Sequence, residues 1–119
     1  MKTITTLLLM LGLVAAGQAM ADPPPHFLAD ARRLLASCTS EAPVLRAMCL
    51  GYLGAIADGT ARHQTIRSTN ETVCVPAAVN LEAYRQIFVV FVTKQPEATQ
   101  WQSYEAMKAA METEWPCSG

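Results

Sequence analysis

Apolar residues recur three and four positions apart in four stretches of the chain, which is the spacing of one face of an α-helix. The stretches cover residues 27–38, 44–62, 81–95 and 97–115. Polar side chains fall mostly between the apolar positions, so each stretch predicts an amphipathic helix with one buried face. The predicted faces are formed by Phe27, Leu28, Ala31, Leu34, Leu35 and Cys38; by Leu45, Met48, Cys49, Tyr52, Leu53 and Ile56; by Leu81, Tyr84, Ile87, Phe88, Phe91 and Val92; and by Trp101, Tyr104, Met107, Met111 and Trp115.

Breaks in this pattern set the helix boundaries. Pro43 stands at or near the start of the second helix, Asn80 is a suitable N-cap for the third, and Pro96 closes the third. Glu97 opens the region of the fourth. The apolar run 87–92 would also suit a buried strand, but the spacing of its aromatic residues favours a helix.

A polar stretch, residues 60–72, separates the second helix from the third. Gly59 precedes it and is expected to loosen or end the second helix. We therefore predict a long exposed loop, and loops of this length in a compact domain are usually functional or disordered.

The first 21 residues have the pattern of a signal peptide. Lys2 gives a positive start, residues 4–14 are apolar, and small residues at Ala19 and Ala21 form a cleavage site. The apolar run is shorter than the roughly 20 residues needed to span a bilayer, although an uncleaved anchor is the alternative. We predict cleavage after Ala21, export from the cytoplasm, and a single mature domain over residues 22–119.

The four cysteines all lie in the mature part. An even number in a small exported chain predicts two disulfides. A metal site is the alternative, but the cysteines are widely spaced and only His26 and His63 could assist them. The sequence therefore predicts no metal and no cofactor. The cysteines in question are Cys38, Cys49, Cys74 and Cys117.

Four helices with short connections predict an all-α domain built from two antiparallel hairpins packed together. Cys38 ends the first helix and Cys49 lies early in the second, so the first hairpin brings them close. Cys74 precedes the third helix and Cys117 follows the fourth, so the second hairpin does the same. The predicted disulfides are therefore Cys38–Cys49 and Cys74–Cys117.

Composition argues against several functions. Removing Lys2 leaves eight basic residues against ten acidic ones, a formal charge of −2. Such a chain lacks the excess of positive charge that binds nucleic acid or an anionic membrane. No motif places a base beside a serine, and no H-E-x-x-H or phosphate-binding glycine loop occurs. Asp58 and His63, five residues apart, would not face each other on one helix. We expect a binding protein with no catalytic residues.

The order of the motifs resembles the Rap/Tai immunity proteins of type VI secretion systems. Residues 49–58 are similar to the family's C-x-G-Y-x-x-G-x-x-D helix, and residues 34–38 to its opening L-L-x-x-C. Residues 74–76 (Cys-Val-Pro), a helix ending at Pro96 and residues 115–117 (Trp-Pro-Cys) follow in the same order. The resemblance covers nearly all of the mature chain.

This resemblance implies a periplasmic, disulfide-bonded helical protein that binds a secreted cell-wall amidase and keeps it inactive. It also implies that the protein can form a homodimer. The motif residues would then be scaffold. The length and polarity of the stretch after the second helix favour it for partner contacts, and a merely solvated loop is the alternative. The scaffold residues are Gly51, Tyr52, Gly54, Asp58, Pro76 and Pro116, and the predicted partner contacts are Arg62, His63, Arg67 and Asn70.

Two other roles fit the same features. A small periplasmic chaperone or stress protein would expose apolar surface when the pH changes, although two histidines allow little change of charge near pH 6. An accessory subunit of an envelope complex is the other alternative.

Overall fold

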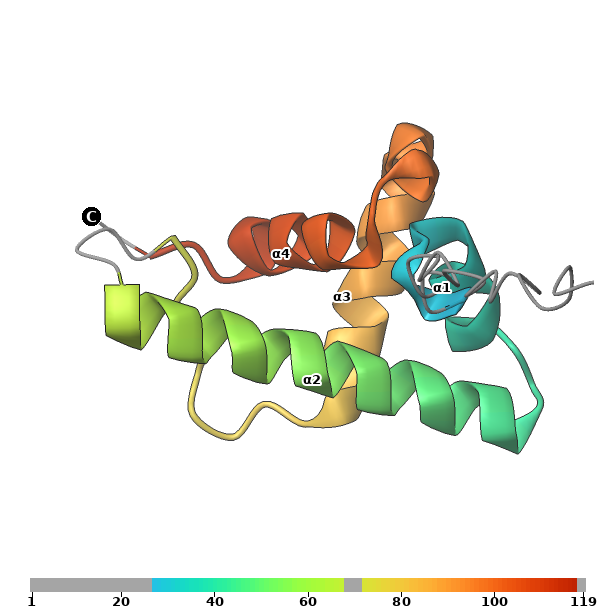
Figure 1. Ribbon diagram of the computed structural model, residues 1–119, viewed down its shortest axis with the longest axis horizontal. Coiled ribbons are helices and arrows are strands. Elements are labelled where there is room, and N and C mark those ends of the chain that lie inside the picture. The colour runs from blue at the N-terminus through green and yellow to red at the C-terminus, as the bar shows by residue number, and fades with distance from the viewer. Residues whose placement is uncertain (1–26, 68–71, 118–119) are drawn as a thin grey trace, which may run out of the picture.

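A computed structural model describes residues 27–67 and 72–117, and in these ranges the chain is helical with no strand (Figure 1). The signal peptide predicted over residues 1–21 lies outside the described residues. Two short 3₁₀-helices, η1 and η2, accompany four α-helices. Their bounds are η1 (Phe27–Ala29), α1 (Ala31–Cys38), α2 (Pro43–Arg67), α3 (Leu81–Lys94), η2 (Pro96–Gln100) and α4 (Ser103–Glu114).

Local capping explains where α1 and α3 begin. The Asp30 carboxylate accepts hydrogen bonds from the backbone N–H groups of Arg32 and Arg33, at 2.9 and 3.2 Å. The Asn80 side chain accepts one from the Ala83 N–H at 2.8 Å. These side chains satisfy N–H groups that the first turn leaves unpaired. Pro43 opens α2 and Asn80 caps α3, as the sequence predicts.

The predicted end of the second helix is wrong. We expected helix to about Arg62 and an exposed loop over residues 60–72, whereas α2 continues to Arg67 and is 25 residues long. Residues 60–67 contain neither glycine nor proline, and most favour helix or tolerate it. The buried Thr60 hydroxyl donates a hydrogen bond to the Ile56 carbonyl at 2.9 Å, so this polar group is satisfied inside the helix. The polarity of residues 60–67 therefore does not mark a loop, because the backbone is helical as far as Arg67.

Two further boundaries differ from the prediction. The first helix is not continuous from Phe27, because Asp30 separates η1 from α1 and forms a bridge with Gln102. The region opened by Glu97 is a 3₁₀-helix, and α4 begins only at Ser103. In the connection between η2 and α4, the Trp101 carbonyl accepts a hydrogen bond from the Ala31 N–H at 3.1 Å. This bond satisfies the first N–H group of α1.

Helix α3 lies at the centre of the domain and contacts each of the other three α-helices. Figure 1 shows α3 crossing α2 and α4 steeply. Helix α1 packs against α2 near the N-terminal part of α2. The core is apolar and continuous. Its largest fully buried apolar side chains are Leu28, Leu34, Leu53, Phe88, Val92, Met107 and Met111.

Both predicted disulfides are confirmed. Cys38 and Cys49 join the end of α1 to α2, with Cα atoms 5.1 Å apart. Cys74 and Cys117 join the segment before α3 to the segment after α4, with Cα atoms 4.9 Å apart. A short backbone pairing supports the second disulfide, since the Cys74 N–H donates to the Trp115 carbonyl at 2.8 Å.

Arg85 of α3 connects the two disulfide-bonded parts of the domain. Its guanidinium donates a hydrogen bond to the Cys38 carbonyl at 3.1 Å, at the end of α1 where carbonyls lack helical partners. The same group pairs with Glu82, which also contacts Arg46 at 3.3 Å. The hydrogen bond from Arg85 lowers the pKa of Glu82, and the bond to Glu82 raises the pKa of Arg85.

Opening either disulfide is expected to destabilise the fold. The closed loops have sequence separations of 43 and 11 residues. In the loop-entropy description these closures are worth about 4 and about 3 kcal/mol. Urea denaturation followed by circular dichroism should therefore show that Cys74→Ser/Cys117→Ser lowers the free energy of unfolding more than Cys38→Ser/Cys49→Ser does. A larger loss for the 38–49 pair would contradict this.

The Glu82–Arg85 pair is expected to make stability depend on pH. Because the pKa of Glu82 is lowered in the folded state, its contribution is complete above the unfolded pKa of about 4.3 and is lost as the pH falls through the folded value. The free energy of unfolding of the wild type should exceed that of Glu82→Gln at pH 7, and the difference should shrink below about pH 4. Glu105→Gln, an exposed carboxylate outside the described ion pairs, is the control. A difference that stays constant down to pH 2 would refute the assignment.

Candidate functional site

The described residues offer little for catalysis or for metal binding. In residues 27–67 and 72–117, no group of three histidine, cysteine or acidic side chains could hold a metal ion. All four cysteines are in disulfides, so none supplies a thiolate. None of the helices in these ranges combines the length and hydropathy that crossing a bilayer requires.

The glycine motif of α2 faces the start of α3. A Cβ atom added to Gly54 would lie 2.7 Å from Leu81 Cδ2, so Gly54 allows a close approach of α3. Gly51 differs, because a Cβ atom there would meet nothing within 4 Å. Tyr52, between the two glycines, is partly buried and packs against the core. Gly54 and Tyr52 thus contact the rest of the fold, whereas Gly51 faces open space.

Asp58 lies on the same side of α2 and helps to form an open concave surface, which we term the glycine hollow. Asp58 is exposed and close enough to Tyr84 of α3 to raise the pKa of that phenol, after the larger effect of burial. The hollow contains no cluster of titratable groups that would indicate acid–base chemistry. It is lined by Gly51, Gly54, Ala55, Asp58, Val79, Asn80, Leu81 and Tyr84.

The two motif prolines flank the Cys74–Cys117 disulfide. Pro116 forms an isolated antiparallel bridge with Val73, directly beside the cross-linked cysteines. Pro76 is exposed, two residues after Cys74. Both prolines are therefore placed where they restrict the backbone on either side of the disulfide.

The predicted partner contacts are not on a loop. Arg62, His63 and Arg67 lie in the last turns of α2, where His63 and Arg67 are one turn apart. Asn70 lies outside the described residues. That these residues contact a partner stays a prediction, now attached to the end of a helix.

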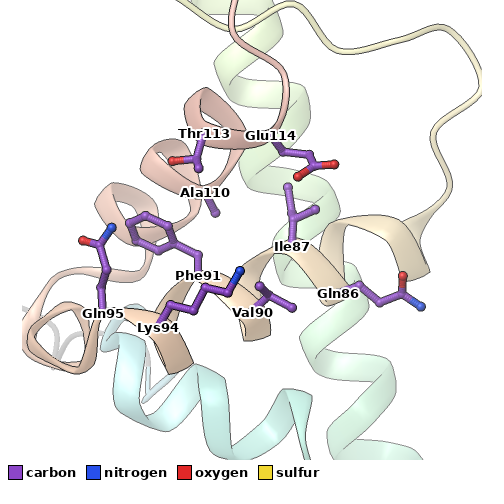
Figure 2. Close-up of a pocket in the computed structure, with 9 residues that line it drawn as sticks. All are labelled: Gln86, Ile87, Val90, Phe91, Lys94, Gln95, Ala110, Thr113 and Glu114. Atoms are coloured by element: carbon purple, nitrogen blue, oxygen red, sulfur yellow. The ribbon is translucent and has the colours of Figure 1, made fainter.

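A second concave surface, which the sequence reasoning missed, lies between α3 and α4 (Figure 2). We call it the α3–α4 groove, and its volume is about 330 Å³. A signal for it exists in the sequence: residues 87–92 are all apolar, yet the core buries fully only Phe88, Phe91 and Val92 of α3. The groove is lined by Gln86, Ile87, Val90, Phe91, Lys94, Gln95, Ala110, Thr113 and Glu114.

Aromatic contacts fix the two walls of this groove relative to each other. The Tyr84 and Trp115 rings pack edge to face, with centroids 5.7 Å apart. The Phe91 ring, which lines the groove, packs against Trp101 with centroids 6.2 Å apart. Such pairs contribute about 0.5–1.5 kcal/mol beyond their buried area. Together with the Cys74–Cys117 disulfide, they give the groove a defined shape without a ligand.

Comparisons with known proteins agree with the helical, disulfide-bonded architecture. The family model of the Rap1a immunity proteins matches residues 30–117, which covers α1 to α4 and all four cysteines. No curated protein and no solved structure matches the chain.

The two glycines of α2 are expected to respond differently to alanine. Gly51→Ala should raise the free energy of unfolding by about 1 kcal/mol, because alanine favours helix and the new methyl group meets no neighbour. Gly54→Ala should raise the free energy of unfolding by less, because the Leu81 side chain must move to make room for the methyl group. Gly59→Ala, which also meets nothing within 4 Å, is the matched control and should behave like Gly51→Ala. Equal gains at Gly51 and Gly54 in urea denaturation would show that the contact with Leu81 has no energetic consequence.

Proposed function

The chain belongs to the Rap1a immunity protein family, and we propose that the secreted effector it neutralises is a peptidoglycan amidase delivered by a type VI secretion system. The family match supplies the immunity role and a protein partner. The amidase and the secretion system are inferred from the resemblance of the sequence motifs to the Rap/Tai proteins. The observation that carries the proposal is this match over nearly all of the described chain.

We place this activity in the periplasm. The predicted signal peptide would deliver the mature chain there, and two disulfides are typical of proteins that fold in an oxidising compartment. Peptidoglycan is the substrate of the proposed effector and lies in the same compartment. An inhibitor held there would meet the effector before the cell wall is cut.

The mechanism we propose is steric. The domain is cross-linked within each helix pair, and Arg85 connects the pairs through the Cys38 carbonyl. A rigid surface binds at a lower cost in conformational entropy than a flexible one. The protein would therefore inhibit by covering the effector's cleft and excluding its substrate, with no chemistry of its own.

The balanced charge of the chain indicates how a partner is recognised. The formal charge of −2 on residues 22–119 provides no strong field to steer association over long distances. Recognition would depend on shape and on a few local polar contacts. The homodimer that the resemblance implies stays a prediction.

The test is protection against, and inhibition of, a defined set of enzymes. Purified peptidoglycan amidases delivered by type VI systems would be assayed on isolated cell walls, with and without the mature chain. We expect inhibition at a one-to-one ratio with at least one of them. In cells, the gene with its signal peptide should protect against that amidase exported to the periplasm, and a version lacking residues 1–21 should not. Failure to bind or inhibit any member of the set would overturn the proposal.

A further inference from the structure

The α3–α4 groove has a small apolar centre, and the core leaves part of it exposed. Val90 lies in its middle and is 49% exposed, while Phe91 beside it is 7% exposed and packs inward. Figure 2 shows Val90 and Ile87 side by side along α3, facing the same hollow as Phe91 and Ala110. Contiguous apolar side chains in a concave site are typical of surfaces that bind a partner.

Two charged side chains border this apolar centre. In Figure 2, Lys94 starts at the end of α3 and its side chain runs back toward Val90, while Glu114 lies beside Ile87. Neither forms an ion pair with any described residue, whereas Arg46, Glu82 and Arg85 are paired, as are Lys108 and Glu112. The groove therefore presents one free positive and one free negative charge.

The remaining rim is polar and uncharged. Gln86 lies in α3 and Gln95 directly follows its last residue, so the axial rise between the two positions is about 13 Å at 1.5 Å per residue. That length fits about four residues of extended chain at about 3.3 Å per residue. Amide side chains both donate and accept hydrogen bonds, so Gln86 and Gln95 suit the main chain of such a segment.

We propose that the α3–α4 groove binds one extended segment of the effector. An apolar side chain of the segment packs against Val90 and Phe91. The segment carries an acidic residue toward Lys94 and a basic residue toward Glu114. This inference rests on the proposed function and assigns the contact to one face of the immunity protein.

The first test substitutes the apolar centre. Val90→Glu places a charge in the groove at a position exposed enough to tolerate it, and Val44→Glu is the matched control on α2, where the valine is 71% exposed. The probe is an amidase that the wild-type protein inhibits, with affinity measured by calorimetry. We expect Val90→Glu to weaken binding by at least about tenfold and Val44→Glu to stay within about twofold.

The second test reverses the two charges without touching the core. Lys94 and Glu114 are exposed, so Lys94→Glu/Glu114→Lys is expected to fold even if Val90→Glu does not. It should slow association and weaken binding by about fivefold or more at low salt. Arg33→Glu/Glu41→Lys, an exposed pair far along the chain from the groove, is the control and should change neither.

The outcomes separate this inference from the function on which it rests. If the wild type inhibits no amidase, the proposed function is wrong. If the wild type inhibits but the charge reversal, and a folded Val90→Glu, bind within twofold of it, the groove is not the contact surface. Loss of binding in the control variants to the same extent would also overturn the assignment.

Discussion

The disulfide between Cys74 and Cys117 encloses α3 and α4, and the arrangement of these two helices depends on it. It joins the segments before α3 and after α4, where a single isolated bridge and a few backbone hydrogen bonds make the other connections. Tyr84 and Trp115 pack against each other at this same end. The walls of the α3–α4 groove are therefore set by a covalent bond and by ring packing, before any partner binds.

The second disulfide has a related role in the other half of the domain. Cys38–Cys49 fixes α1 against the start of α2, and the Cys38 carbonyl then accepts a hydrogen bond from Arg85. Since Arg85 belongs to α3, this partly buried side chain adds a polar connection between the two cross-linked halves, which also share the core. A chain of this length buries a modest core, so these cross-links supply a substantial part of its stability. A protein built in this way is suited to holding a fixed surface against another protein.

Much of this architecture could be predicted from the sequence, because the signals are local. The cap at Asp30 was not predicted, because the apolar spacing runs without a break from Phe27 to Cys38. In the structure Asp30 divides this stretch into η1 and α1. The disulfide pairing followed from the order of cysteines and helices, since Cys38 and Cys49 flank the first connection while Cys74 and Cys117 flank the third and fourth helices. The C-terminal part of α2 was not predicted, because polar residues beyond Gly59 suit an exposed helix as well as a loop. The groove was missed for a different reason: the helical spacing leaves Val90 off the predicted buried face, and whether such a residue borders a groove depends on how α4 packs across α3.

Amide hydrogen–deuterium exchange of the free and the amidase-bound protein tests the central claim most directly. The account predicts that α3 and α4 are already well protected in the free protein. Binding should then slow exchange further at the groove, over residues 86–95 and 110–114, and little elsewhere. Rapid exchange throughout α3 and α4 before binding, or new protection confined to another face of the domain, would contradict it.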